Sequence, residues 1–253
     1  MIKTIISNID KNNIDEAEIK KQAKLLKEGN TVIFPTETVY GLGANALDEN
    51  AVKKIYEAKG RPSDNPLIVH ISSKEEVYKL ANDISDKAKV LMSKFWPGPL
   101  TMIFKKKDIV PQRTSGGLDT VAIRMPSHKI ARELIKQAGI PIAAPSANIS
   151  GRPSPTKGEH VCAEMNGRVS GIVVGGDCNF GLESTVIDMT MDIPMILRPG
   201  SVTKEQLEVE IGQVLIDPSL ENKEDVLKAK APGMKYTHYS PNGDVFIVTG
   251  KED

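Results

Sequence analysis

Short apolar runs that are typical of β-strands alternate with helical stretches along the first 210 residues. The strand-like runs span residues 31–34, 67–71, 100–104, 120–125, 141–144, 171–176, 184–189 and 194–198. The helical stretches span residues 15–28, 48–59, 74–82, 85–95, 128–138, 156–165 and 203–210. Interspersed strands and helices predict an α/β domain, and the succession of strands late in the series favours a mixed sheet over a simple doubly wound one.

The chain changes character after about residue 212. Residues 213–243 contain Pro218, Pro232 and Pro241, with a helical tendency only over 222–230, and therefore resemble an interdomain linker. The segment GDVFIVTG at 243–250 then reads as a single strand, which cannot bury its apolar side chains alone. We therefore predict a first domain over 1–212, a linker over 213–243, and over 244–253 the first strand of a second domain that is cut short.

Composition and charge narrow the class of protein. Hydrophobic residues make up 40% and charged residues 26% of the 253, and the formal net charge is +0, which argues against a nucleic-acid binder that works mainly by bulk charge. The two cysteines form no CxxC motif, which favours free thiols in a reducing compartment over a zinc site. Neither a signal peptide nor an apolar run of membrane-spanning length is visible. We expect a soluble cytoplasmic protein without a membrane partner.

Polar residues that could carry chemistry gather in five segments at strand ends and in loops, where α/β proteins place ligands. They are PTETVYGLG (35–43), KGRPSDNPL (59–67), DTVAIRMP (119–126), APSANISGRPS (144–154), and ESTVID (183–188) with LRPGS (197–201) after it. Any one of them alone is more often structural, because Arg-Pro pairs end helices and Ser/Asn runs form turns. Their combination is more informative.

The cations in these segments suit a triphosphate. Lys59, Arg61 and Arg198 are groups of the kind that clamp phosphates, and hydroxyl and backbone N–H groups of 144–154 could bind further phosphate oxygens. The sequence contains no G-x-x-x-x-G-K-[ST], G-x-G-x-x-G or G-x-S-x-G motif. A bound nucleotide would therefore be held by the loops of an unusual sheet.

The histidines and Cys162 have structural explanations. His70, inside the apolar run LIVHI, would more often be a core histidine than a catalyst. His128, His160 and His238 lack metal-ligand spacing and are expected to be structural or exposed, and Cys162 to pack on a helix. The sequence predicts no metal site of its own.

The segments together resemble one family, the threonylcarbamoyl-AMP synthases built on the YrdC-like domain. FPTETVYGLGANA, KGRPSDNPL, APSANISGRPSPT, and ESTVID followed by LRPG stand in the order of that family, over about residues 14–205. APGMKYTHYSP (231–241) is similar to the linker of the two-domain branch, in which a smaller Rossmann-like domain follows. The resemblance implies a YrdC-like twisted open mixed sheet flanked by helices, followed by an extended linker.

The resemblance also implies a reaction. L-threonine and bicarbonate or CO₂ would give a carbamate on the threonine nitrogen, and a carbamate oxygen would attack the α-phosphorus of ATP, releasing pyrophosphate and leaving threonylcarbamoyl-AMP. A downstream threonylcarbamoyl-transferase complex would pass the group to adenosine 37 of tRNAs. The carbamate is its own nucleophile, so no catalytic nucleophile is expected, and Mg²⁺ would arrive with ATP.

The site residues follow from the resemblance position by position. The L-threonine pocket would be lined by Thr38, His70, Arg124, Ala144 and Ser184. ATP would be held by Lys59, Arg61, Asn65, Thr120, Ser146, Ser154 and Arg198, with Tyr236 of the linker folding over it as a lid. Lys59, Arg61 and Arg124 would align the substrates, with Arg124 as the partner of the threonine carboxylate. Asn65 stands where many relatives have a basic residue.

The motif PTETVYGLG (35–43) is expected to form one wall of the threonine pocket. Thr38 would face threonine, while Gly41 and Gly43 would let the backbone turn tightly beside it. The hydroxyls of Thr36 and Tyr40 would serve as scaffolding.

Two other functions stay open. The first is a tRNA- or double-stranded-RNA-binding module without turnover, for which steeply salt-dependent tRNA binding would speak; a contact of the enzyme itself with tRNA also stays open. The second is a carbamoyl carrier for metallocentre assembly. Such proteins place the domain in much longer chains with zinc-finger and acylphosphatase parts, which this sequence does not show.

Overall fold

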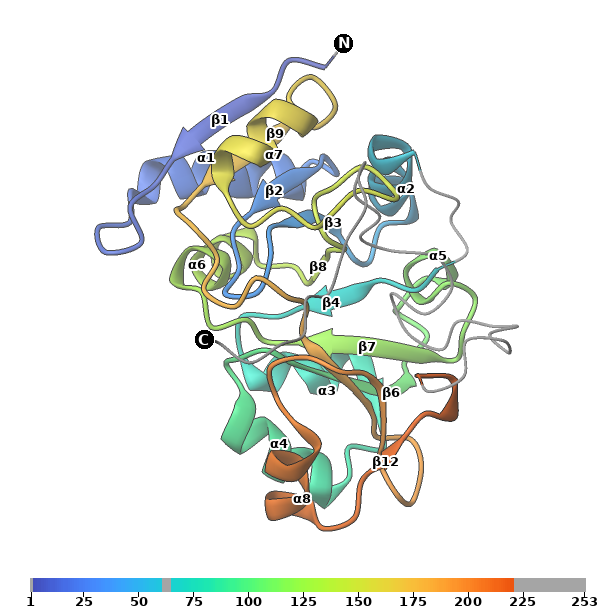
Figure 1. The fold of residues 1–253 in the computed structure, drawn as a ribbon. Coiled ribbons are helices and arrows are strands. Elements are labelled where there is room, and N and C mark those ends of the chain that lie inside the picture. Colours follow the sequence, from blue (N-terminus) through green and yellow to red (C-terminus); the bar gives the residue numbers. More distant parts are fainter. Residues whose placement is uncertain (1, 61–64, 221–253) are drawn as a thin grey trace, which may run out of the picture.

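The computed structural model describes residues 2–60 and 65–220, which form an open twisted sheet flanked by helices (Figure 1). The strands are β1 (Ile5–Asn8), β2 (Val32–Phe34), β3 (Gly41–Asn45), β4 (Ile68–His70), β5 (Ala81–Asn82), β6 (Leu100–Lys106), β7 (Thr120–Arg124), β8 (Ile142–Ala143), β9 (Gly171–Val174), β10 (Thr185–Asp188), β11 (Met195–Arg198) and β12 (Leu215–Ile216). The α-helices are α1 (Glu16–Lys27), α2 (Glu49–Lys59), α3 (Val77–Leu80), α4 (Asp86–Phe95), α5 (Gln112–Ser115), α6 (Lys129–Ala138), α7 (Gly158–Met165) and α8 (Lys204–Ile211). Two 3₁₀ helices, η1 (Lys74–Glu76) and η2 (Pro218–Leu220), complete the elements.

The sheet is mixed, as predicted. Its strand order is β1-β9-β2-β3-β8-β4-β7-β6-β10-β11-β12, with β5 paired to β6 beside that path. Parallel pairs such as β4 with β7 and β6 with β10 are interrupted by antiparallel pairs such as β2 with β3 and β6 with β7. The central strands β4, β7 and β6 therefore bring together segments that are far apart in the sequence.

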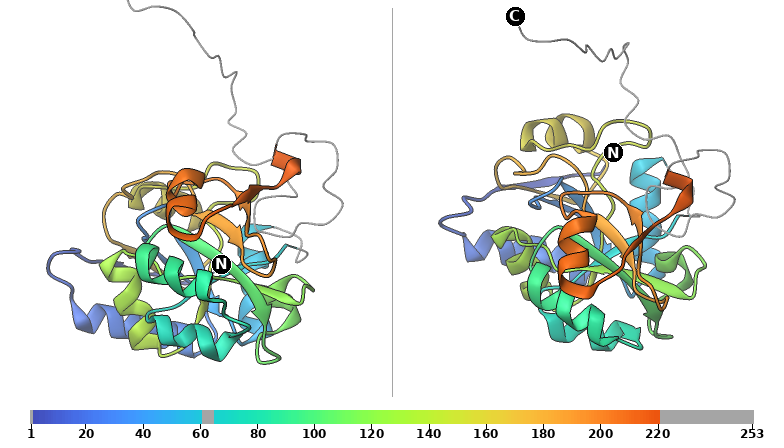
Figure 2. Two further views of the ribbon diagram at one scale, coloured as in Figure 1. Left: turned by 90° about the horizontal axis from the view of Figure 1, so that it is seen from below. Right: turned by 60° about the horizontal axis from the view of Figure 1, so that its bottom comes forward.

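The predicted helices begin and end where their capping residues stand. The Asp15 carboxylate accepts the N–H groups of Ala17 and Glu18 at the start of α1. Asp48 does the same for α2, which ends at Gly60 in the left-handed conformation. These contacts satisfy backbone groups that a helix end otherwise leaves without partners. Figure 2 shows α1 and α6 side by side on one face of the sheet, where Leu26 and Leu134 belong to one buried cluster.

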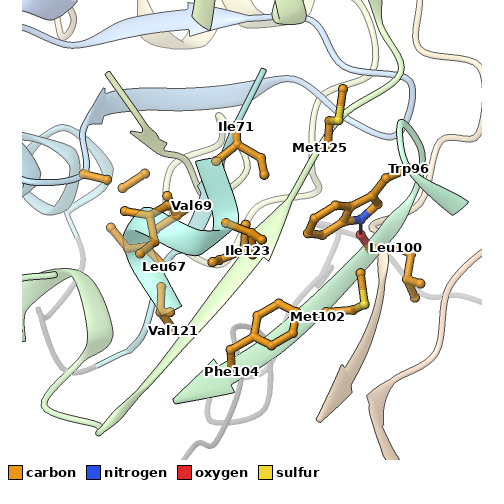
Figure 3. Packing of buried hydrophobic residues seen from close by; sticks show 14 of the residues in the cluster. Leu67, Val69, Ile71, Trp96, Leu100, Met102, Phe104, Val121, Ile123 and Met125 are labelled. Carbon is orange, nitrogen blue, oxygen red and sulfur yellow. Dashed lines mark hydrogen bonds between the residues drawn. The ribbon is translucent and has the colours of Figure 1, made fainter. Parts of the chain in front are cut away.

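The central strands divide their side chains between two faces, because successive residues of a strand point in opposite directions. On one face Val69, Ile123 and Met102 belong to the large core cluster shown in Figure 3. In the same cluster the Trp96 indole donates a hydrogen bond to the Leu100 carbonyl oxygen at 2.7 Å. The opposite face of these strands carries the polar residues of the candidate site.

The prediction for Gly41 and Gly43 was wrong. Both glycines lie in β3, which pairs antiparallel with β2, and neither has a positive φ. A Cβ atom on Gly43 would come within 2.7 Å of both Ile142 Cγ2 and Phe34 Cε1, so this glycine allows close packing and not a turn. The turn lies before it, at 36–39.

Other elements also escaped prediction. Four short strands, β1, β3, β5 and β12, and the one-turn helix α5 carry too weak a pattern to be read from the sequence. β12 pairs with β11 and so places the start of the predicted linker at the edge of the sheet. η2 follows within the linker, whereas the linker from residue 221 onward and the strand expected over 244–253 lie outside the described residues, and the division into domains stays a prediction.

Two smaller observations complete the fold. Cys162 is half-buried and packs against the large core cluster, as expected, and Cys178 does the same. Within the described part of the chain, no helix has the length and apolar character needed to cross a membrane.

Candidate functional site

Strand pairing brings four polar side chains to the same region of the sheet. His70 ends β4 and stands in register with Arg124, which ends β7. Thr101 of β6 is in register with Arg124 on its other side. Thr101 Oγ1 lies 2.7 Å from Ser184 Oγ, just before β10, so the strand ends align these residues across the sheet.

Arg124 is the centre of this group. Its side chain is buried, and its three nitrogens contact two segments of the chain, the turn that contains Glu37 and Thr38 and the loop that contains Gly98. Nη1 donates to Thr38 Oγ1 at 2.9 Å, Nε donates to the Gly98 carbonyl oxygen at 3.3 Å, and Nη2 lies 2.7 Å from Glu37 Oε1. A buried guanidinium is costly unless it is paired, and the Glu37 carboxylate supplies that pair.

The charge state of the group follows from burial and from Arg124. Burial raises the pKa of Glu37, but the charge of Arg124 and its contact outweigh burial and hold that pKa below its usual value. Burial, together with the charge of Arg124, lowers the pKa of His70 to about 3. At neutral pH the region therefore holds one cation, one anion and a neutral imidazole.

Thr38 is held by the turn that contains it. Thr36 Oγ1 accepts the N–H groups of Thr38 and Val39 at 3.2 Å and donates to the Val39 carbonyl oxygen at 2.6 Å. Tyr40 OH donates to the Gly176 carbonyl oxygen at 2.6 Å, which ties the turn to the loop after β9. The hydroxyls of Thr36 and Tyr40 thus act as scaffolding, as predicted.

The loop between β9 and β10 covers the same turn. The N–H groups of Asn179 and Phe180 donate to the Glu37 carbonyl oxygen at 3.1 and 3.0 Å, and that of Gly181 donates to the Thr38 carbonyl oxygen at 3.2 Å. Two segments more than 130 residues apart thereby form a single wall around Thr38.

Lys59 shapes the neighbouring loop over 144–154. Its buried ammonium donates to the carbonyl oxygens of Ser146 and Asn148 at 2.5 and 2.6 Å. Ser146 Oγ lies 2.5 Å from Asn148 Oδ1, and Ser154 Oγ lies 2.5 Å from Glu183 Oε1. Lys59 therefore holds the loop that carries the predicted phosphate-binding hydroxyls, in addition to any phosphate contact.

Arg198 on β11 contacts Ser184. Its Nη2 donates to the Ser184 carbonyl oxygen at 2.9 Å and to Ser184 Oγ at 3.1 Å, while Nε donates to the same carbonyl at 3.1 Å. Ser184 in turn contacts Thr101 next to Arg124.

Asn65 and Thr120 lie at the other end of the central strands. Thr120 begins β7 and Arg124 ends it, so they are separated by roughly 13 Å along the strand. Asn65 precedes β4, which runs parallel to β7. The Asn65 side chain is fully buried, and neither its amide oxygen nor its amide nitrogen has a hydrogen-bond partner in the described structure. This amide is a candidate for contact with a ligand that extends along the strands.

The structure thus brings most of the predicted residues into two adjoining groups. Thr38, His70, Arg124 and Ser184 form one group, and Ala144 adjoins it because its N–H donates to the Ile68 carbonyl oxygen at 2.9 Å. The second group comprises Lys59, Ser146 and Ser154, and it adjoins the first because Ser154 contacts Glu183, next to Ser184; Arg198 contacts Ser184 itself. Arg61 and Tyr236 lie outside the described residues, and the roles of all these residues remain predictions.

Four further residues support the groups and were given no role from the sequence. Glu37 pairs with Arg124, Thr101 with Ser184, Asn148 with Ser146 and Lys59, and Glu183 with Ser154. Glu37 and Asn148 lie inside the polar segments 35–43 and 144–154, so the sequence could have marked them as candidates. Thr101 gave only the signal of a polar residue inside an apolar strand.

Comparison with family models identifies two matching regions. The Sua5_yciO_yrdC model, described as "Telomere recombination", matches residues 24–200. The Sua5_C model, described as "Threonylcarbamoyl-AMP synthase, C-terminal domain", matches residues 202–253.

Similar proteins agree with these models. A curated threonylcarbamoyl-AMP synthase of Pyrococcus abyssi is 54% identical over 250 residues, which covers 99% of this chain and 73% of that protein. The one of Bacillus subtilis is 53% identical over 245 residues, covering 96% of this chain and 70% of that protein. The crystal structure of P. abyssi Sua5 complexed with L-threonine superposes with a TM-score of 0.91 at 54% identity, covering 94% of this chain and 69% of that one.

Proposed function

Because the chain belongs to the Sua5/YrdC family of threonylcarbamoyl-AMP synthases, we propose that it converts L-threonine, bicarbonate or CO₂, and ATP into threonylcarbamoyl-AMP and pyrophosphate. The observation that carries the proposal is the buried guanidinium of Arg124 between Thr38 and Glu37, beside a neutral His70. A guanidinium can bind the carboxylate of an α-amino acid with two parallel hydrogen bonds. The P. abyssi relative has been solved with L-threonine bound.

In the proposed reaction the residues position substrates and offset charge. The threonine amine forms a C–N bond to the carbon of CO₂ and releases a proton to solvent; with bicarbonate, a C–O bond breaks and the departing hydroxide leaves as water with the amine proton. A carbamate oxygen then bonds to the α-phosphorus as the bond from that phosphorus to the bridging oxygen breaks, and pyrophosphate leaves. Arg124 would hold the threonine carboxylate, with Thr38, His70, Ala144 and Ser184 around the rest of the amino acid. Alignment of this kind is what nucleotidyl transfer requires.

The second group of residues would hold ATP. Arg198, Ser146 and Ser154 would contact the nucleotide phosphates next to Ser184, with Lys59 beside them, and Asn65 and Thr120 would lie further along the strands. Arg61 and the lid residue Tyr236 are proposed from the family resemblance alone. Because Arg198 contacts Ser184, the phosphates and threonine would meet between the two groups.

Mg²⁺ would accompany ATP. No group of three or more His, Cys, Asp or Glu side chains suited to a metal ion occurs within residues 2–60 and 65–220. Mg²⁺ bound mainly by phosphate oxygens and water fits these residues, since this ion usually keeps several waters in nucleotide sites.

The product would serve tRNA modification. We propose that the reaction takes place in the cytoplasm and that a threonylcarbamoyl-transferase complex carries the group to adenosine 37 of tRNA.

Pyrophosphate release from ATP tests the proposal. Release should require both threonine and bicarbonate, and omission of either should reduce it to background. Release that ignores threonine would contradict the proposed reaction. Salt-dependent tRNA binding without any turnover would instead favour the RNA-binding module.

A further inference from the structure

We propose that Glu37 is a positioning residue of the threonine site, which acts by holding the Arg124 guanidinium in the orientation that receives the α-carboxylate. This inference rests on the proposed function, because it assumes that Arg124 binds threonine. Glu37 has no role in the predicted residue set.

Glu37 is not itself a partner for the α-carboxylate, because its lowered pKa keeps it an anion at neutral pH and two anions repel, whereas the Arg124 cation attracts a carboxylate. The side chains of Arg124 and Glu37 are only 4% and 3% exposed. Both Glu37 carboxylate oxygens are buried atoms, and the backbone carbonyl of Glu37 is covered by the N–H groups of Asn179 and Phe180. Glu37 therefore reaches the site through Arg124.

The contact between the two charges leaves donors of Arg124 for a further acceptor. Glu37 Oε1 and Arg124 Nη2 are 2.7 Å apart and form an ion pair that engages one side of the guanidinium. Of the five N–H groups of a guanidinium, the described partners accept one from Nε and one from Nη1. The remaining donors on Nη1 and Nη2 suit the two oxygens of a carboxylate.

No other charged side chain described around Arg124 replaces Glu37. His70 on β4 is neutral, since burial lowers its pKa to about 3. Burial also lowers the pKa of His128, at the start of α6, and raises that of Cys178, in the loop after β9, to about 12. At neutral pH these groups carry no charge that could orient a guanidinium, so orientation depends on Glu37 together with the neutral acceptors Thr38 Oγ1 and Gly98 O.

The first experiment compares the two substrates in Glu37→Gln. Loss of the carboxylate should lower kcat/KM for threonine about tenfold and change the KM for ATP less than about twofold. Glu76→Gln is a matched control: the Glu76 carboxylate is half-buried, accepts N–H groups of Ser72 and Ser73, and lies outside the site. It should leave the kinetic constants for both substrates unchanged.

The second experiment asks whether Glu37 acts through Arg124. In an Arg124→Ala background, adding Glu37→Gln should lower kcat/KM for threonine by less than about twofold further, because the group that Glu37 orients is absent. Effects of the two substitutions that multiply would overturn the proposal. So would a single Glu37→Gln variant with unchanged threonine kinetics.

Glu37→Asp keeps the experiment informative if the glutamine variant does not fold. Aspartate retains the charge but is shorter by one methylene, so threonine use should fall several-fold with ATP use preserved. An equal fall for both substrates would contradict a positioning role. If the unmodified enzyme releases pyrophosphate without regard to threonine, the proposed function fails; if it depends on threonine and the Glu37 variants show no selective loss, only this inference fails.

Discussion

The proposed threonine wall (Thr38, His70, Arg124, Ser184) and the proposed nucleotide wall (Lys59, Ser146, Ser154, Arg198) are constructed differently. The first is fixed largely by strand register, with buried contacts between side chains such as the 2.9 Å bond from Arg124 to Thr38. The second depends on a loop that Lys59 holds through main-chain carbonyl oxygens. A wall fixed by a sheet is preorganised, whereas a wall made by a loop can adapt to its ligand.

This difference predicts separable effects of substitution. Changes in the threonine wall should affect threonine and leave ATP largely unaffected, and changes in the nucleotide wall should do the reverse. Arg198 is the exception to the division, because it contacts Ser184 from the nucleotide side.

Arg124→Ala should produce the largest effect. It removes the cation expected at the threonine carboxylate, so kcat/KM for threonine should fall at least about a hundredfold, or ~3 kcal/mol, with a much smaller change in the KM for ATP. Pyrophosphate release at varied concentrations of each substrate measures both. The buried Glu37 would also lose its counter-ion, which should lower the free energy of unfolding by about 3–5 kcal/mol.

Arg132→Ala is the control for that substitution. Arg132 is exposed on α6, and its loss should change neither substrate constant. If Arg124→Ala lowered kcat/KM equally for threonine and for ATP, the assignment of separate substrates to the two walls would be wrong.

Lys59→Met tests the nucleotide wall, with a smaller expected effect. Methionine preserves most of the side-chain length but leaves the carbonyl oxygens of Ser146 and Asn148 without the ammonium donor. The loop should loosen, so the KM for ATP should rise roughly tenfold, with less than a threefold change for threonine.

Lys54→Met is matched to it. Lys54 lies on the same helix α2 and donates to the Gly29 carbonyl oxygen at 2.7 Å, away from the candidate site. Its loss should affect stability without changing the KM for ATP. If Lys59→Met and Lys54→Met changed the KM for ATP equally, the proposed role of the 144–154 loop in binding ATP would be refuted.

The elements that could be predicted from the sequence are those whose signal is local to one segment of the chain. The predicted helices over 15–28 and 48–59 match α1 and α2 to within one residue at each end, because apolar spacing is a local signal. β3 was missed because GLGAN has little β propensity, and Gly43 is needed only for close packing against Phe34 and Ile142.

From the sequence the candidate site was predicted as a set of residues, whose roles stay predictions, and not as a set of contacts. The motifs pointed to Arg124 and Ser184, yet the pairing of Glu37 with Arg124 and of Thr101 with Ser184 depends on strand register between segments distant in the chain. Such register is a tertiary property that single-sequence patterns do not encode.

The smallest effect concerns the charge of the threonine wall. His70 has a native pKa of about 3, because burial and the charge of Arg124 disfavour the imidazolium, whereas an unfolded histidine has a pKa near 6.5. Below about pH 6.5 the unfolded chain therefore binds a proton that the native state does not, and the free energy of unfolding falls as pH falls toward 3. The contribution of His70 to the free energy of unfolding should decrease by about 0.7 kcal/mol between pH 7 and pH 6.

Urea unfolding at the two pH values measures this contribution. The fall in the free energy of unfolding from pH 7 to pH 6 should be smaller by about 0.7 kcal/mol in His70→Gln than in the unmodified protein. It should be unchanged in His160→Gln, since His160 is exposed. If the free energy of unfolding of His70→Gln fell between pH 7 and pH 6 as much as that of the unmodified protein, His70 would be charged or hydrated in the native state. The threonine wall would then be less dry and less rigid than its burial indicates, and so closer in construction to the nucleotide wall.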